Sequence, residues 1–204
     1  MATYIIVTVI AYLIGSISFS VIISKKMGGI DVRKKGSKNA GATNVLRTVG
    51  KKAGAITLLC DVLKGVVAVL IAIIVGKIIT GIDQKLLIQL AGIFVVIGHT
   101  FPIFFGFKGG KGVATSLGVL FVINWQIALI CLIFAIVLIA ITKMVSVGSI
   151  LASVLIPVLM IVLKPDYFVF AILLAILVIY NHRENIKRIS QGKENKIGGK
   201  AWKK

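Results

Sequence analysis

Long uncharged apolar runs constrain this chain more than any other feature. The stretches LICLIFAIVLIAI and LASVLIPVLMIVL contain no charged residue, and such runs suit the hydrocarbon core of a membrane, which a helix of about 20 residues can cross. The chain as a whole is 58% hydrophobic, with a mean hydropathy of +1.06, whereas soluble domains are about half apolar. We therefore expect an all-α integral membrane protein.

Seven apolar segments can be drawn along the sequence, and the fourth and seventh are short for a membrane span. The segments are 4–23, 54–75, 86–105, 113–124, 126–142, 145–163 and 167–181. The opening MATYIIVTVIAYLIG lacks a basic start and an A-x-A site, so it predicts a retained helix rather than a cleaved signal. We expect a bundle of about seven transmembrane helices that forms a single domain over residues 1–204.

The chain carries 24 Lys and Arg against 6 Asp and Glu, and the cations are unevenly distributed. Twenty of them lie at 24–53, 106–112, 143 and after 181, whereas the alternate loops hold only Lys77, Lys85 and Lys164. Because cytoplasmic loops are enriched in Lys and Arg, we predict an outward N-terminus and a cytoplasmic C-terminus. No soluble basic domain is present that could bind nucleic acid, so we expect no nucleic-acid partner.

Every polar-rich stretch falls on the predicted cytoplasmic side, and GFKGGKGVATS is the first of them. Its glycines open an expected helix, where unpaired N–H groups and the helix dipole favour a phosphate. The spacing does not match a P-loop, and the alternative is a flexible basic loop at the lipid headgroups. The candidate substrate-binding residues here are Lys108, Gly109, Gly110, Lys111 and Gly112.

The stretch GSKNAGATNVLR offers short donors and acceptors, together with an arginine that can bind a phosphate through two hydrogen bonds. Its candidate site residues are Ser37, Asn39, Thr43, Asn44 and Arg47. The alternative is equally open: Ser, Asn and Gly also occur in turns for reasons of backbone geometry alone.

NHRENIKR, after the last apolar segment, contributes His182 and Asn185, which become neighbours if the segment is helical. Histidine is the most common general base near neutral pH, and His99 is a second candidate. Asp61 and Lys64 lie three residues apart within an apolar segment, where an ion pair that braces the bundle is at least as plausible as a catalytic role.

Two isolated cysteines, Cys60 and Cys131, form no metal-binding or disulfide pattern, and we expect neither a metal nor a cofactor. The sequence therefore leaves two classes of function: an enzyme acting on phosphorylated compounds, or a membrane transporter or channel for a phosphorylated small molecule.

Three stretches, GSKNAGATNVLR, GHTFPIFFGFKGGKGVAT and HRENIKRISQGKE, resemble the signature regions of the bacterial acyl-phosphate:glycerol-3-phosphate acyltransferases, the PlsY family. GSISFSVIISK, DVRKKGS and DVLKG also fit, so the resemblance spans nearly the whole chain. The sequence departs from the family at Lys38, where a glycine is usual, and at SISF, where SIPF is usual. The His-x4-Asp pair of other glycerolipid acyltransferases is absent, since Phe104 and Lys187 stand at the aspartate positions.

The resemblance implies transfer of a fatty acyl group from acyl phosphate to the sn-1 hydroxyl of sn-glycerol 3-phosphate, giving lysophosphatidic acid for phospholipid biosynthesis. It implies that Ser37, Arg47, His182 and Asn185 serve catalysis, and that Lys108 and the glycines bind glycerol phosphate. It further implies that Glu194 is structural, and that Ser146 and Ser149 contact phosphate. The implied location is the bacterial cytoplasmic (inner) membrane, among its lipids, with the active site on the cytoplasmic face.

Overall fold

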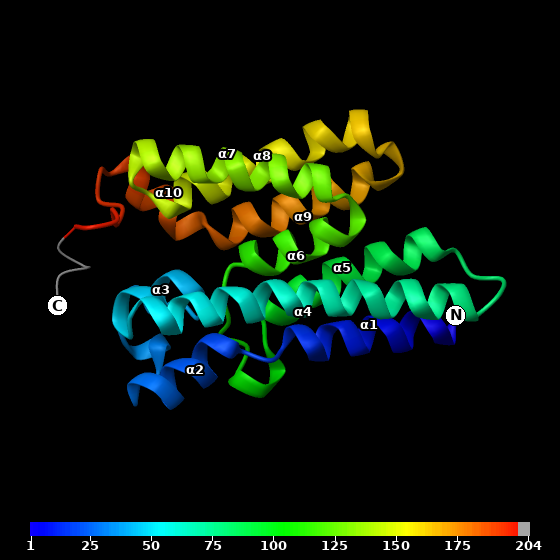
Figure 1. Cartoon of the computed structure of the whole chain (residues 1–204), viewed down its shortest axis with the longest axis horizontal. Coiled ribbons are helices and arrows are strands. Elements are labelled where there is room, and N and C mark those ends of the chain that lie inside the picture. Colours follow the sequence, from blue (N-terminus) through cyan, green and yellow to red (C-terminus); the bar gives the residue numbers. More distant parts are fainter. Residues whose placement is uncertain (200–204) are drawn as a thin grey trace. The chain divides into compact units, whose positions relative to one another are not determined.

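The computed structural model describes residues 1–199, and these form helices, turns and loops without a β-strand. The chain divides into two compact units, Met1–Ile123 and the part from Asn124 onward. Figure 1 shows their helices in chain order. Each unit is built from α-helices because a backbone surrounded by lipid must satisfy its hydrogen bonds within its own segment.

The first unit contains six α-helices and two short 3₁₀ turns. Their bounds are α1 Ala2–Gly15, α2 Phe19–Gly28, η1 Val32–Lys34, α3 Ala42–Thr48, α4 Lys51–Ile78, α5 Gln84–Thr100, η2 Ile103–Phe105 and α6 Val113–Ile123. The main packing pairs are α1 with α5 and α4 with α6, and α4 also packs on α5.

Glycines allow these helices to approach closely. A Cβ added to Gly15 of α1 would collide with the Val95 carbonyl of α5, and one added to Gly98 of α5 would collide with the Tyr12 carbonyl. Gly65 of α4 has the same relation to helix α6. Small residues at helix crossings are typical of membrane bundles, where close van der Waals packing replaces the hydrophobic effect.

The described part of the second unit, residues 124–199, contains four α-helices and one 3₁₀ turn. Their bounds are α7 Trp125–Thr142, α8 Val145–Leu163, η3 Pro165–Tyr167, α9 Phe168–Asn181 and α10 Arg183–Ser190. Helix α8 packs against both α7 and α9. The Asn124 side chain caps α7 by accepting a hydrogen bond from the Ile127 N–H, which satisfies a donor that has no partner within the helix.

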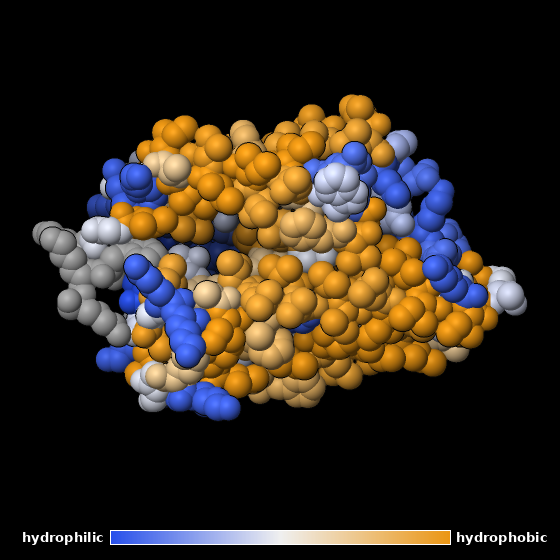
Figure 2. Space-filling view, in the orientation of Figure 1, coloured by the Kyte–Doolittle hydropathy of each residue, from blue (hydrophilic) through white to orange (hydrophobic). Residues whose placement is uncertain are grey.

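Within residues 1–199, five helical stretches are long and apolar enough to cross a membrane, and the bent pair Pro165–Asn181 and Arg183–Ser190 makes a sixth. The predicted segment 113–124 forms only the 11-residue helix α6, which extends about 16 Å against a hydrocarbon thickness of about 30 Å. The structure thus supports a helical membrane protein with five or six candidate spans. In Figure 2 the helix surfaces are mainly hydrophobic, and hydrophilic residues gather near the helix ends.

The first predicted segment, 4–23, is not one continuous helix. The chain breaks after α1 and resumes as α2, which extends to Gly28. The Lys64 ammonium of α4 donates to the carbonyls of Gly15 and Ile17 at 2.9 and 3.0 Å. Lys64 is thus a partner for two carbonyls at the break; the Ile17 carbonyl also accepts the Phe19 N–H at 3.2 Å.

Candidate active site

The first polar loop is organised around the buried side chain of Asn44. Its amide nitrogen donates to the carbonyls of Val32, Lys35 and Asn39 at 2.9, 3.0 and 3.1 Å, and its oxygen accepts the Ser37 N–H at 3.0 Å. All polar atoms of this amide are therefore engaged with the backbone. The observed contacts favour the loop-geometry interpretation for Asn44 over direct contact with a substrate.

The other polar residues of this loop are more accessible. Ser37 is exposed, and Asn39, Thr43 and Arg47 are half-buried. Thr43 and Arg47 belong to the short helix α3, whose position is fixed by packing against α4. The Asn44 contacts hold the Ser37 backbone in place, so its hydroxyl is carried on an ordered loop.

The glycine loop is attached to the end of helix α5. The N–H groups of Gly109 and Gly110 donate to the carbonyls of Thr100 and His99, each at 3.1 Å. This differs from the expectation that these two donors face a phosphate, because α5 already uses them. The two glycines instead allow close approach to α5, since a Cβ on either would collide with His99.

The N-terminus of helix α6 follows directly and has features of an anion site. Gly112 has a φ of +86°, a conformation that glycine adopts readily. The first helical N–H groups, at residues 113–115, have no carbonyl one turn earlier within α6. The buried hydroxyls of Thr115 and Ser116 also lack a hydrogen-bond partner among the described residues.

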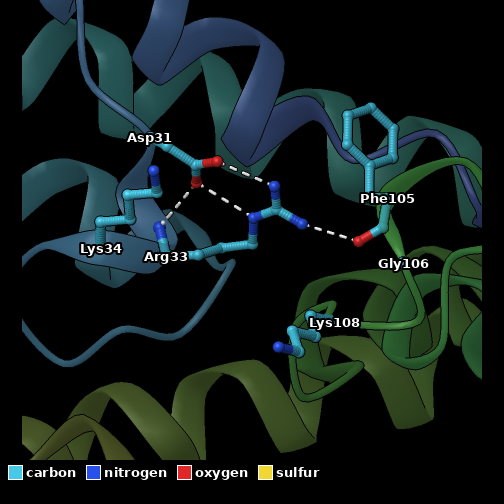
Figure 3. A pocket seen from close by; sticks show the side chains of 6 residues that line it. All are labelled: Asp31, Arg33, Lys34, Phe105, Gly106 and Lys108. Atoms are coloured by element: carbon cyan, nitrogen blue, oxygen red, sulfur yellow. Dashed lines mark hydrogen bonds and ion pairs between the residues drawn. The ribbon is translucent and has the colours of Figure 1, made fainter.

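A pocket of about 370 Å³ lies beside the glycine loop and is shown in Figure 3. It is lined by Asp31, Arg33, Lys34, Phe105, Gly106 and Lys108. Arg33 lies between the two loops: it donates to both oxygens of Asp31 at 3.0 and 2.8 Å and to the Phe105 carbonyl at 2.7 Å. The pocket therefore combines Lys108, a predicted substrate-binding residue, with Arg33, whose guanidinium is held by hydrogen bonds.

The Arg33–Asp31 pair has a clear electrostatic signature. Hydrogen bonds from the Arg33 side chain lower the pKa of Asp31 to about 2, and the same contact raises the pKa of Arg33. Neither residue was assigned a role from the sequence. One signal was available: Asp31 is one of six acidic residues in the chain, and it precedes an arginine by two positions.

Asp61 and Lys64 form the expected ion pair inside the bundle, with Nζ 3.0 Å from Oδ1 and both side chains almost fully buried. His99 of α5 joins them, since its Nδ1 lies 3.4 Å from the same carboxylate oxygen. The imidazole of His99 therefore faces a buried carboxylate through Nδ1.

The second unit has its own polar cluster, organised by Glu194. One carboxylate oxygen accepts from Ser146 at 3.0 Å and Asn185 at 2.7 Å, and the other accepts from Arg188 at 2.8 Å. Glu194 thus connects the start of α8 with α10 and the segment that follows it. The Ser149 hydroxyl donates to the Val145 carbonyl of its own helix instead.

His182 lies at the bend between α9 and α10, where the two helices meet at 59°. Its Nδ1 is 2.8 Å from the Val178 carbonyl, so Nδ1 carries a proton and donates it to this carbonyl. The structure therefore groups His182, Asn185, Ser146 and Glu194 in the second unit. It groups the first polar loop, the glycine loop, Asp61, Lys64 and His99 in the first unit.

Fold and polar clusters together define an integral membrane protein built from apolar helices, with basic and hydroxyl-bearing loops in its first unit. The family profile for glycerol-3-phosphate acyltransferases matches residues 5–192. The chain belongs to the glycerol-3-phosphate acyltransferase family. This confirms the resemblance found in the sequence and makes the protein an acyltransferase, in place of the transporter alternative.

Individual relatives agree with the family assignment. The glycerol-3-phosphate acyltransferase of Clostridioides difficile is 52% identical over 199 residues, which cover 97% of each chain. That of Shouchella clausii is 46% identical over 93% of each chain. Two crystal structures of PlsY (YgiH), an integral membrane glycerol 3-phosphate acyltransferase, are 39% identical over 95% of each chain. Their TM-scores are 0.87 for the glycerol 3-phosphate form and 0.85 for the lysophosphatidic acid form.

Proposed function

We propose that this acyltransferase transfers a fatty acyl group from acyl phosphate to the sn-1 hydroxyl of sn-glycerol 3-phosphate. The hydroxyl oxygen attacks the acyl carbon, the bond from that carbon to the phosphate oxygen breaks, and lysophosphatidic acid and inorganic phosphate leave. The departing phosphate accepts the hydroxyl proton. Because acyl phosphate is a mixed anhydride with a good leaving group, orientation and charge neutralisation supply most of the catalysis.

The observation that carries this proposal is the N-terminus of α6. Buried hydroxyls at Thr115 and Ser116 have no hydrogen-bond partner in the described chain, and they stand where helix donors favour an anion. Buried polar groups are nearly always satisfied, and we assign a bound phosphate as the partner of these hydroxyls. Two similar solved structures are described as glycerol 3-phosphate and lysophosphatidic acid forms, which agrees with a phosphorylated substrate and product.

We assign substrate binding to Gly112, Lys108 and Lys111, aided by Asn39 and Thr43 of the first loop. Gly109 and Gly110 serve binding indirectly, because their N–H groups attach the loop to α5. Asn44 likewise acts through the backbone of Ser37. In the second unit, Ser146 and Asn185 share the Glu194 carboxylate, which suits a structural role for that glutamate.

We assign chemistry to Ser37 and Arg47 in the first unit and to His182 and Asn185 in the second. Arg47 neutralises phosphate charge, since guanidinium binds it in a planar, two-point geometry. We assign His182, whose Nδ1 is held by a backbone carbonyl, the role of orienting a reacting group. Asp61 and Lys64 brace the first unit from within.

For the whole chain we propose one acyltransferase domain over 1–204 with seven spans, an outward N-terminus and an active site on the cytoplasmic face of the bacterial inner membrane. The family match runs from 5 to 192 and therefore crosses both compact units. The uneven distribution of Lys and Arg supports the orientation, and the short helix α6 counts as one span within this scheme.

The experiment uses purified protein in lipid, radiolabelled glycerol 3-phosphate and either palmitoyl phosphate or palmitoyl-CoA free of acyl phosphate. We expect lysophosphatidic acid with the first donor only, and no requirement for coenzyme A or metal. Lys108→Met raises KM for glycerol 3-phosphate about tenfold or more, as expected for one lost charge-assisted hydrogen bond. Lys187→Met, which removes an exposed cation of α10, is the matched control. Equal turnover of the two donors refutes the donor assignment.

A further inference from the structure

The first unit contains a buried charged group that the proposed chemistry does not use. Asp61 and Lys64 have side chains that are 2% and 3% exposed, and His99 is 7% exposed. Ionisable residues inside a membrane segment are costly, and those that occur usually have a function. Lys64 has a clear structural task at the break between α1 and α2. Asp61 is the counterion of Lys64, but this ion pair does not account for His99.

His99 connects this charged group with the glycine loop through two different contacts. Its backbone carbonyl accepts the Gly110 N–H at 3.1 Å. Its imidazole lies against the same residue, because a Cβ on Gly110 would collide with His99 Nε2 and lie 2.9 Å from Cε1. Nδ1, on the other side of the ring, is 3.4 Å from Asp61. The ring is thus held between a carboxylate and the loop.

Gly110 is also the point where the two polar loops of the first unit meet. A Cβ on Gly110 would lie 2.8 Å from the Ala40 carbonyl of the first loop. Ala40 is buried and lies three residues after Ser37. The position of the His99 ring therefore affects both the glycine loop that precedes α6 and the loop that carries Ser37.

We propose that His99 is a positioning residue for glycerol 3-phosphate binding, and that Asp61 orients it. The Asp61 carboxylate lies 3.4 Å from Nδ1 of His99; its attraction for this side of the ring fixes the ring plane and directs Nε2 to the junction of the loops at Gly110. The ring then holds the glycine loop in the position in which the N-terminus of α6 can bind the phosphate. This inference rests on the proposed function, because substrate binding is its main readout.

Two double variants test the orienting contact while keeping charge constant. Asp61→Asn with Lys64→Met removes both charges but leaves an amide oxygen to accept the His99 proton. Asp61→Leu with Lys64→Met removes the same charges and leaves no acceptor. Both lose the Lys64 contacts with Gly15 and Ile17, so that loss cancels in the comparison.

We call Asp61→Asn with Lys64→Met the asparagine pair and Asp61→Leu with Lys64→Met the leucine pair. We expect the asparagine pair to keep the wild-type KM for glycerol 3-phosphate within about threefold. We expect the leucine pair to raise it about tenfold or more, with a smaller change in kcat, because small displacements of positioning groups have effects of this size. Equal KM and kcat in the two double variants overturn the proposal. If the leucine pair does not fold, the variants His99→Gln and His99→Met replace it. A glutamine amide can donate to Asp61 and a methionine cannot, so KM for glycerol 3-phosphate should be lower in His99→Gln. Equal KM values in the two variants refute the positioning role.

A readout without turnover separates this inference from the proposed function. Phe107 is exposed in the glycine loop, so Phe107→Cys, with Cys60 and Cys131 replaced by Ala, reports loop accessibility to a maleimide. The leucine pair should be labelled about threefold or more faster than the asparagine pair, since a loop held by fewer contacts opens more often. If the labelling difference is observed but the wild type shows no acyl transfer, the proposed function is refuted and the positioning role is not. Equal labelling rates refute the positioning role.

Discussion

Replacement of Asn44 tests whether this residue holds the loop or binds substrate. Asn44→Ala removes the donor shared by the Val32, Lys35 and Asn39 carbonyls and the acceptor of the Ser37 N–H. A buried group left unsatisfied costs about 1–3 kcal/mol, and only the contact with Val32 is fully buried. We therefore expect about 2–4 kcal/mol of destabilisation, which lowers Tm by about 5–15 °C for a chain of this size. Thermal unfolding in detergent measures it.

The same variant has a distinct kinetic signature. Because the Ser37 backbone loses its anchor, kcat should fall about tenfold or more, whereas KM for glycerol 3-phosphate should change less. Asn39→Ala is the control for stability, since Asn39 is half-buried and its side chain makes no hydrogen bond within the described residues; its Tm should stay near wild type. The reasoning fails if Asn44→Ala unfolds like wild type and mainly raises KM, because that pattern indicates direct substrate contact.

Three further predictions concern other parts of the chain. Glu194→Gln should retain more activity than Glu194→Ala in steady-state assays, because Gln keeps an acceptor for Ser146 and Asn185; equal losses would contradict the bridging role. The Asp31 pKa of about 2 lies below its ordinary 3.8, so the ion pair with Arg33 stabilises the fold above about pH 4 and loses that effect as pH falls towards 2. Asp31→Asn should show a smaller decrease in Tm over this range, and an identical decrease would show that the pair does not contribute. For topology, a cysteine at position 2 should react with an impermeant maleimide from outside intact cells and one at position 193 only after permeabilisation; outside labelling of both would exclude an odd number of spans.

The sequence predicted the helical segments of the second unit well. Segment 145–163 coincides with α8, and 126–142 differs from α7 by one residue. Apolar runs bounded by Lys, Pro or Asn define such helices because a membrane-spanning backbone has few alternatives to helix. The first segment was less predictable. At its break, the Gly15 and Ile17 carbonyls bind Lys64, which lies 49 and 47 residues further along the chain.

In the candidate site, too, some features could be predicted from the sequence and others depend on tertiary contacts. The motifs indicated which stretches are polar and that phosphate is the suitable ligand. They could not distinguish Asn44, whose amide is fully used by the backbone, from Asn39, which has the same side chain five residues earlier. Nor could they show that α5 uses the N–H groups of Gly109 and Gly110. Residue type states what a side chain can bind, whereas partners remote in sequence decide what it does bind.

The sequence by itself determined the membrane class, the family and the places where polar chemistry occurs, because apolarity and residue type are local properties. Only the tertiary structure decided that Arg33 joins the first loop to the Phe105 carbonyl, that Glu194 gathers Ser146, Asn185 and Arg188, and that Asp61 faces His99. Most of these contacts join residues far apart in the chain. They depend on which elements pack together, and the hydrophobic pattern of a lipid-exposed helix does not encode which neighbour it will meet.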